Sequence, residues 1–214
     1  MKHQRARLIS AVLGTALLGL ALAGCAPIIL GGAAMGTLVA TDRRTSGAQL
    51  EDEGIELRAA GRIRENLADR AHVSVTSYNR QVLLSGEVPS AQDRQLVEQI
   101  VSRVENVRSI VNELAVLGNS TLVQRSSDAL TTGKVKAAMV DAKDLFANSF
   151  KVVTERGTTY LMGRVTQREA NRATELTRST SGVQKVVRVL EIISEEELQR
   201  TLPQQPAPAV APKT

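Results

Sequence analysis

One short module occurs twice in this chain, and this internal repeat limits the possible folds more than any other feature. Residues 82–88 read Val-Leu-Leu-Ser-Gly-Glu-Val and residues 159–165 read Thr-Tyr-Leu-Met-Gly-Arg-Val, so that their glycines stand 77 positions apart. In both copies a polar, helix-like segment follows. A further match, at an offset of 76, pairs residues 107–111 with residues 183–187. A repeat held over roughly 60 residues predicts two copies of one structural unit.

The pattern of apolar residues predicts the same order of elements in each copy: helix, strand, strand, helix, strand. Ile55, Ala59, Ile63 and Leu67 recur at helical spacing, whereas the short runs around the glycine alternate or are continuously apolar, as in strands. For the first copy we expect helices at 55–68 and 91–104 and strands at 73–77, 82–85 and within 107–117. For the second copy we expect a helix that Ser127 or Asp128 caps and that runs to about 142, strands at 150–154 and 158–162, a helix at 167–179 and a last strand that ends near 193.

A strand, helix, strand connection of this length favours a parallel third strand with a right-handed crossover. The predicted fold class is therefore α+β, with two tandem αββαβ units, each a three-stranded mixed sheet with two helices on one face. Because a unit of about 60 residues is only marginally stable alone, we expect the two copies to pack on each other or on the segment between them.

The start of the chain resembles a bacterial lipoprotein signal. Residues 1–24 contain a basic stretch and an apolar core, and Leu22-Ala23-Gly24-Cys25 forms a lipobox. Cys25 would carry the lipid; the alternative is a plain secretory signal with an incidental cysteine. Ala26 stands where an Asp would favour retention in the inner membrane, so we expect a protein that is anchored in the outer membrane and faces the periplasm, without spanning the bilayer. As the only cysteine, Cys25 also excludes an internal disulfide.

The composition divides the chain into segments. After the signal at 1–24 we expect a lipidated tether and linker at 25–53, a first domain at 54–117, a linker at 118–127 and a second domain at 128–194. Residues 195–214 turn acidic and then rich in Pro, Gln and Ala, a composition that cannot bury a core and that predicts a disordered tail.

The sequence offers little for catalysis or for binding nucleic acid. Only 2% of the residues are aromatic, so there are few rings on which bases or sugars could stack. No nucleophile elbow, zinc-protease motif, CxxC or phosphate loop is present. His72 reads as a surface or edge histidine, and the sequence alone gives no credible set of metal ligands. We therefore expect no enzyme activity, no metal and no cofactor.

Charge distinguishes the two copies. Residues 54–117 carry eight Arg and eight acids, whereas residues 128–193 carry eleven Lys and Arg against seven acids, a net charge of +4. In the first helix of the second copy Lys136, Val140 and Lys143 follow at i, i+4 and i+7. An exposed apolar residue between lysines suits an anionic membrane surface, since lysine stems lie along apolar material while their ammonium groups reach phosphates. A solvated helix face is the alternative interpretation.

Several motifs together resemble a known family. The repeated Leu-Xaa-Gly-Xaa-Val centre, Ser181-Gly182-Val183 before the last strand, and the lipobox are similar to those of the dual BON-domain outer-membrane lipoproteins. The resemblance implies two BON domains in a non-enzymatic periplasmic protein that is held in the outer membrane, supports envelope integrity and concentrates at division sites. It also implies that the second BON domain binds anionic phospholipid.

In that family the first helix of the second domain meets lipid, with an aromatic residue near its start. Alignment on Lys134 puts Leu130 at the place of the aromatic residue and Gly133 where a Thr would stand. Loss of the aromatic residue weakens the expected apolar insertion, so we expect the lysines to contribute more to binding. The candidate lipid-binding residues are Leu130, Thr132, Lys134, Lys136, Val140 and Lys143. The rival hypothesis is a protein-binding envelope scaffold without direct lipid recognition, whose partners would be envelope or division proteins.

Overall fold

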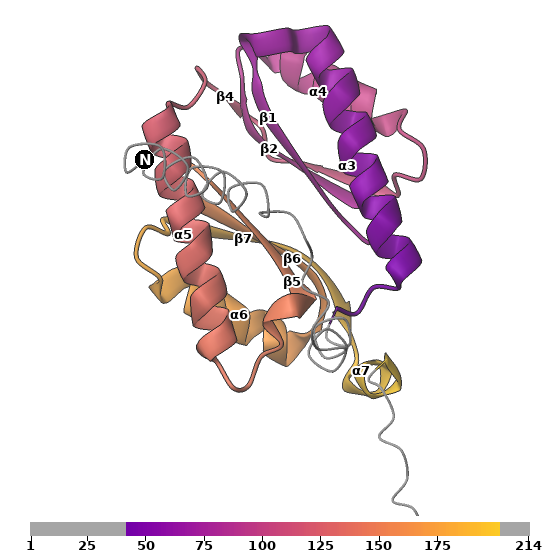
Figure 1. Ribbon diagram of the computed structural model, residues 1–214, viewed down its shortest axis with the longest axis vertical. Coiled ribbons are helices and arrows are strands. Elements are labelled where there is room, and N and C mark those ends of the chain that lie inside the picture. Colours follow the sequence, from indigo (N-terminus) through magenta and orange to yellow (C-terminus); the bar gives the residue numbers. More distant parts are fainter. Residues whose placement is uncertain (1–41, 202–214) are drawn as a thin grey trace, which may run out of the picture. The chain divides into compact units, whose positions relative to one another are not determined.

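The computed structural model describes residues 42–201, in which the predicted order of elements occurs twice (Figure 1). The first copy consists of α3 (Ser46–Leu67), the short η1 (Ala68–Arg70), β1 (His72–Tyr78), β2 (Gln81–Val88), α4 (Ala91–Ser102), β3 (Ser109–Asn112) and β4 (Ala115–Val116). The second consists of α5 (Leu122–Asp141), η2 (Ala147–Ser149), β5 (Phe150–Glu155), β6 (Thr158–Thr166), α6 (Gln167–Ser179) and β7 (Lys185–Ile193), and α7 (Glu195–Thr201) follows.

Both sheets have the predicted mixed topology. In the first copy β1 pairs antiparallel with β2, and β2 pairs parallel with both β3 and β4. The expected third strand is thus divided in two, because the chain leaves the ladder at residues 113–114, where Leu114 is buried in the core. In the second copy β5 pairs antiparallel with β6, and β6 pairs parallel with an unbroken β7 over nine residues.

Each sheet is covered on one face by two helices of its own copy (Figure 1). In the first copy Ile55 of α3 and Val97 of α4 pack with Leu84 of β2. In the second copy Val135 of α5 and Ala173 of α6 belong to one cluster with strand residues such as Leu161. The α+β fold predicted from the repeat is therefore confirmed.

The faces of the two sheets that the helices leave free pack against each other. Side chains alternate along a strand, so Leu83, between two residues of the helical core, points the other way. It forms a third apolar cluster with Tyr78 of β1 and, from the second copy, with Tyr160, Met162 and Val189. The two copies thus pack on each other, as expected, and Ser120 of the segment between them also donates to Glu87 of the first copy.

The glycine of each repeat permits a close backbone approach. Gly86 has φ +107°, and a Cβ atom there would lie 2.1 Å from the carbonyl oxygen of His72. A Cβ atom on Gly163 would lie 2.4 Å from the carbonyl oxygen of Ser149. Any side chain would force the second strand of the hairpin away from the entry to the first, which explains why both copies place glycine here.

Three predicted boundaries are wrong. Helix α3 begins at Ser46 instead of residue 55, because the Thr45 hydroxyl caps it by accepting a hydrogen bond from the Ala48 N–H at 3.1 Å. Helix α5 begins at Leu122, where Thr121 and Gln124 form a capping box, so neither Ser127 nor Asp128 is the cap. Residues 195–201 of the predicted disordered tail form α7, whose Leu198 is buried.

Candidate functional site

Helix α5 exposes an apolar stripe along its full length. Its buried face consists of Asp128, Thr131, Val135 and Met139. On the exposed side Val123, Leu130 and Ala137 recur every seven residues, which keeps them on one face of a helix with 3.6 residues per turn. Leu122, Val123, Leu130 and Val140 are 78%, 80%, 69% and 70% exposed, so four of the ten exposed large apolar side chains in residues 42–201 lie on this helix. We call Leu122, Val123, Leu130, Ala137 and Val140 the α5 stripe.

Lysines lie on both sides of the α5 stripe. At about 100° per residue, Lys134 stands beside Leu130 on one flank and Lys136 stands beside Val140 on the other, and both are exposed. The Lys134 ammonium donates a hydrogen bond to Ser181 Oγ at 3.2 Å. Asp141 is the single acid on the exposed side of α5, at its last residue. The stripe is thus an apolar band with cationic edges.

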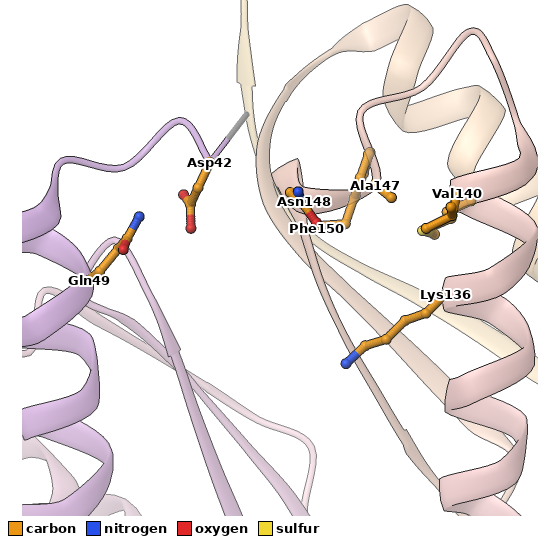
Figure 2. Close-up of a pocket in the computed structure, with 8 residues that line it drawn as sticks. Asp42, Gln49, Lys136, Val140, Ala147, Asn148 and Phe150 are labelled. Carbon is orange, nitrogen blue, oxygen red and sulfur yellow. The ribbon is translucent and has the colours of Figure 1, made fainter. Parts of the chain in front are cut away.

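A cavity of about 530 Å³ opens beside the Lys136 flank. Figure 2 shows Lys136 and Val140 projecting from α5 toward this space, with Phe150 and Asn148 beyond them and Gln49 on the other side. Met139 contributes to the apolar lining. The cavity provides an apolar recess edged by one cation, Lys136, one carboxylate, Asp42, and two side-chain amides.

The structure brings together most, but not all, of the predicted lipid-binding residues. Leu130, Lys134 and Val140 share the exposed side of α5, and Lys136 lies at its margin. Lys143 is exposed in the loop after α5, beyond the end of the helix at Asp141. Thr132 is half-buried and lines a different cavity with His72, so it lies apart from the stripe. Cys25 lies outside the described residues.

Sequence reasoning missed Leu122 and Val123, the two most exposed apolar residues of the stripe. Both fall in residues 118–127, for which the sequence predicts a linker. The pattern Thr121-Xaa-Xaa-Gln124 is a capping-box signature that could have placed the start of α5 correctly and, with it, these two side chains.

A second group of polar residues, around Glu87 of β2 and Arg156 of the β5–β6 turn, joins the two copies. The carboxylate of Glu87, which is completely buried, accepts from Arg156 Nε at 2.6 Å and from the Ser120 N–H at 3.2 Å, and its Oε2 lies 3.0 Å from His72 Nδ1. Burial acts to raise the pKa of Glu87, but these hydrogen bonds hold the pKa below its usual value. His72 lies at an edge of the sheet, as predicted, because β1 is an edge strand. Its side chain, however, takes part in the polar network around Glu87.

Comparison with known proteins agrees with the repeated fold. A family model described as the BON domain matches residues 52–118 and again residues 127–194, which are the two sheet-and-helix copies. The chain belongs to the BON domain family. Among the helices in residues 42–201, none is long and apolar enough to cross a bilayer.

Two relatives match this BON-domain chain over most of their length. It is 35% identical to the outer membrane lipoprotein DolP of Haemophilus influenzae over 174 residues, which cover 80% of this chain and 90% of the relative. It is 30% identical to the 21 kDa hemolysin of Actinobacillus pleuropneumoniae over 154 residues, 71% of this chain and 79% of that one. A solved structure of CdsD from the type III secretion system of Chlamydia trachomatis aligns at 12% identity over 69% of this chain and 99% of its own, with a TM-score of 0.29.

The similarity to DolP places this BON-domain chain among the outer-membrane lipoproteins, as the lipobox before Cys25 predicts. The BON-domain relatives of this kind are not a known class of enzyme.

Proposed function

We propose that this lipoprotein binds the surface of membranes rich in anionic phospholipid through the α5 stripe and its flanking lysines, and that this contact supports the integrity of the envelope. The observation that carries the proposal is the coincidence of two features on one helix face. Large apolar side chains are exposed along one face, with the small residues Ser126 and Gly133 between them, and Lys134 and Lys136 border this face on opposite sides. A helix of this kind lies in the plane of a membrane interface with its apolar side toward the acyl chains.

The magnitudes indicate a weak contact that depends on the anchor. Complete burial of a Leu or Val side chain is worth about 1.5–3 kcal/mol, and each lysine near an anionic surface adds about 1 kcal/mol. Partial insertion of the stripe recovers only a fraction of the free energy of complete burial. This fraction must offset the rotational and translational freedom that is lost on binding. A lipid on Cys25 would remove most of that loss, because it holds the domain at high effective concentration beside the bilayer.

The charge contribution is tested by sedimentation with vesicles. We would use the chain from residue 25 onward with Cys25→Ser, so that no lipid anchor contributes, and compare phosphatidylglycerol with phosphatidylcholine vesicles. The test variant changes Lys134, Lys136 and Lys143 to Glu. The matched control changes Arg178, Lys185 and Arg188 to Glu, three exposed cations of the same domain outside α5, so that both variants change the net charge equally.

We expect the parent chain and the control to sediment with anionic vesicles, less so as salt is added, and the α5 variant to stay in solution. Equal losses in the two variants would mean that binding follows net charge alone and would contradict a role of α5. No sedimentation of the parent chain with either vesicle would contradict direct lipid binding. It would favour the rival function, a protein-binding envelope module whose exposed Val140 and lysines contact a partner.

The apolar contribution has its own control in the first domain. Leu130→Ser with Val140→Ser removes two exposed side chains of the stripe. Leu50→Ser with Leu57→Ser removes two equally exposed leucines from α3. We expect the first pair of changes to weaken vesicle binding severalfold and the second to leave binding unchanged. Equal effects would contradict the assignment of the contact to α5.

A further inference from the structure

Three strands place a histidine and two glutamates next to one another where the two copies meet. His72 is the first residue of β1 and lies directly opposite Glu87 of β2 in the antiparallel register. Glu155 is the last residue of β5 in the second copy. One potential ligand atom of each side chain lies within 4.8 Å of the other two. No sequence pattern indicates this group, because the residues are up to 83 positions apart and belong to different copies of the repeat.

The surroundings of these three side chains are rich in negative charge. Glu87 is completely buried, and Asp128 lies nearby with its carboxylate bound to the backbone N–H groups of Arg156 and Gly157 at 2.8 and 2.9 Å. Within residues 42–201 the Glu155 carboxylate has neither a salt bridge nor a hydrogen-bond donor, unlike that of Glu87.

Two of the three side chains, His72 and Glu155, line a cavity, whereas Glu87 is completely buried and does not line it. A cavity of about 370 Å³ is lined by His72, Asp128 and Glu155, together with Arg125 and residues of β5. The cations that face the group are Arg156, which binds Glu87, and Arg125, whose Nε donates to Ser120 Oγ at 3.2 Å. With neutral His72, the three carboxylates of Glu87, Asp128 and Glu155 exceed these two guanidinium groups by one negative charge.

We propose that His72, Glu87 and Glu155 form a binding site for a divalent transition-metal cation of the Zn²⁺ class, which would link the hairpin of the first domain to the second domain. One imidazole and two carboxylates are a ligand set that Zn²⁺ accepts, with a fourth position left for water. Bonds of about 2.0–2.2 Å place tetrahedral ligand atoms about 3.5 Å apart. The contact between His72 and Glu87 is already shorter than this, at 3.0 Å, and the ligand atom of Glu155 lies within 4.8 Å of both, so small side-chain movements bring the three atoms to this spacing.

The ligand chemistry separates Zn²⁺ from the common hard cations. Ca²⁺ takes six to eight oxygen ligands and Mg²⁺ keeps an octahedral shell of oxygens, whereas this group offers an imidazole nitrogen and one oxygen from each of two carboxylates.

Metal binding is measured on the whole chain from residue 25 onward with Cys25→Ser, which removes the only thiol, and His72 is then the single histidine. Zn²⁺ is titrated in competition with a chromophoric chelator, and Co²⁺ is added in parallel because a low-coordinate site gives it strong visible absorption. The variants are Glu155→Gln and His72→Gln. The matched control is Glu175→Gln, an exposed glutamate of α6 in the same domain as Glu155.

We expect one equivalent of Zn²⁺ to bind with a dissociation constant in the micromolar range or below, and at least a tenfold loss of affinity in each ligand variant but not in the control. Because Glu155 makes no polar contact in the described residues, Glu155→Gln tests the site even if His72→Gln impairs folding. Absence of saturable binding by the parent chain would overturn the proposal. Binding that Glu155→Gln leaves unchanged would also overturn it. Neither outcome bears on lipid binding by α5.

Discussion

The buried salt bridge between Arg43 and Glu169 gives a sharp test of how the first described residues are held to the second BON domain. The guanidinium makes two parallel bonds to the carboxylate, at 2.8 and 2.7 Å, and Nη1 also donates to the Arg164 carbonyl oxygen at 2.9 Å. The Arg43 side chain is 4% exposed and the Glu169 side chain is 1% exposed. Arg43→Met keeps the apolar stem but leaves a buried carboxylate whose remaining donors come from Thr166. Removing one partner of such a pair costs about 3–5 kcal/mol, and we expect a loss of this size at pH 7.

The loss should depend on pH. Burial acts to raise the pKa of Glu169, but the bonds from Arg43 and Thr166 bring it below its usual value. In the parent chain this group therefore contributes stability that is present above its unfolded pKa and is lost as pH falls through the folded pKa. Without Arg43 the pKa of Glu169 rises, so the carboxyl group is protonated more readily and the difference between variant and parent shrinks as pH falls from 7 toward 5.

Urea unfolding at pH 7 and pH 5 measures both free energies from the transition midpoint and slope. The control is Arg172→Met, which removes an exposed partner of Asp144 on the same α6 helix as Glu169 and should cost less than about 1 kcal/mol. A cost of Arg43→Met below about 1 kcal/mol, or one equal at the two pH values, would refute the view that this pair is buried and charged in the folded state.

Three further substitutions test backbone and core packing by thermal or urea unfolding. Gly133→Ala should stabilise the chain by about 0.5–1 kcal/mol, because a Cβ atom at this helical, exposed position meets nothing within 4 Å; destabilisation would contradict the helix there. Gly86→Ala should cost about 1–3 kcal/mol from its positive φ alone and more from the clash with the His72 carbonyl group. Leu83→Ala, between the two sheets, should cost about 2–5 kcal/mol; a loss below 1 kcal/mol would mean that the sheets do not share this core.

The strands and hairpins could be predicted because their signals are local. Both hairpin turns contain residues with positive φ, Asn79 and Arg80 at 50° and 65° and Arg156 and Gly157 at 48° and 71°, and such residues mark two-residue turns. The start of α3 could not be predicted in this way. Its first turns are polar, and Asp52 is buried because its carboxylate accepts hydrogen bonds from Ser77 Oγ and from two backbone N–H groups of the β1–β2 turn. Because these hydrogen-bond partners lie more than 20 residues away in the sequence, no apolar periodicity marks this part of the helix.

The same limit applies to the candidate sites. The lysines of α5 are evident from composition and spacing, whereas contacts between the copies depend on positions that differ within the repeat. Glu87 and Arg164 occupy the same place, one residue after the central glycine. Glu87 binds Arg156 of the other copy, whereas Arg164 forms salt bridges with Glu191 and Glu197. Two copies with opposite charges at equivalent positions cannot form equivalent sites, so the repeat predicts the fold of each copy but not the chemistry between them.

The equivalent helices of the two domains show why exposed apolar residues alone are not enough to propose a membrane-binding face. Leu50 and Leu57 of α3 are 70% and 76% exposed, and their separation of seven residues puts them on one side, as in α5. Glu53, however, lies between them and is exposed, and it offsets the charge of Arg64, which follows Leu57 by seven residues, so this face has no net charge to attract an anionic surface. In α5 the positions between the apolar residues are small or neutral until Asp141, and lysines border the stripe. The second domain therefore combines exposed apolar surface with favourable charge, and this combination is the physical reason to propose membrane binding by α5.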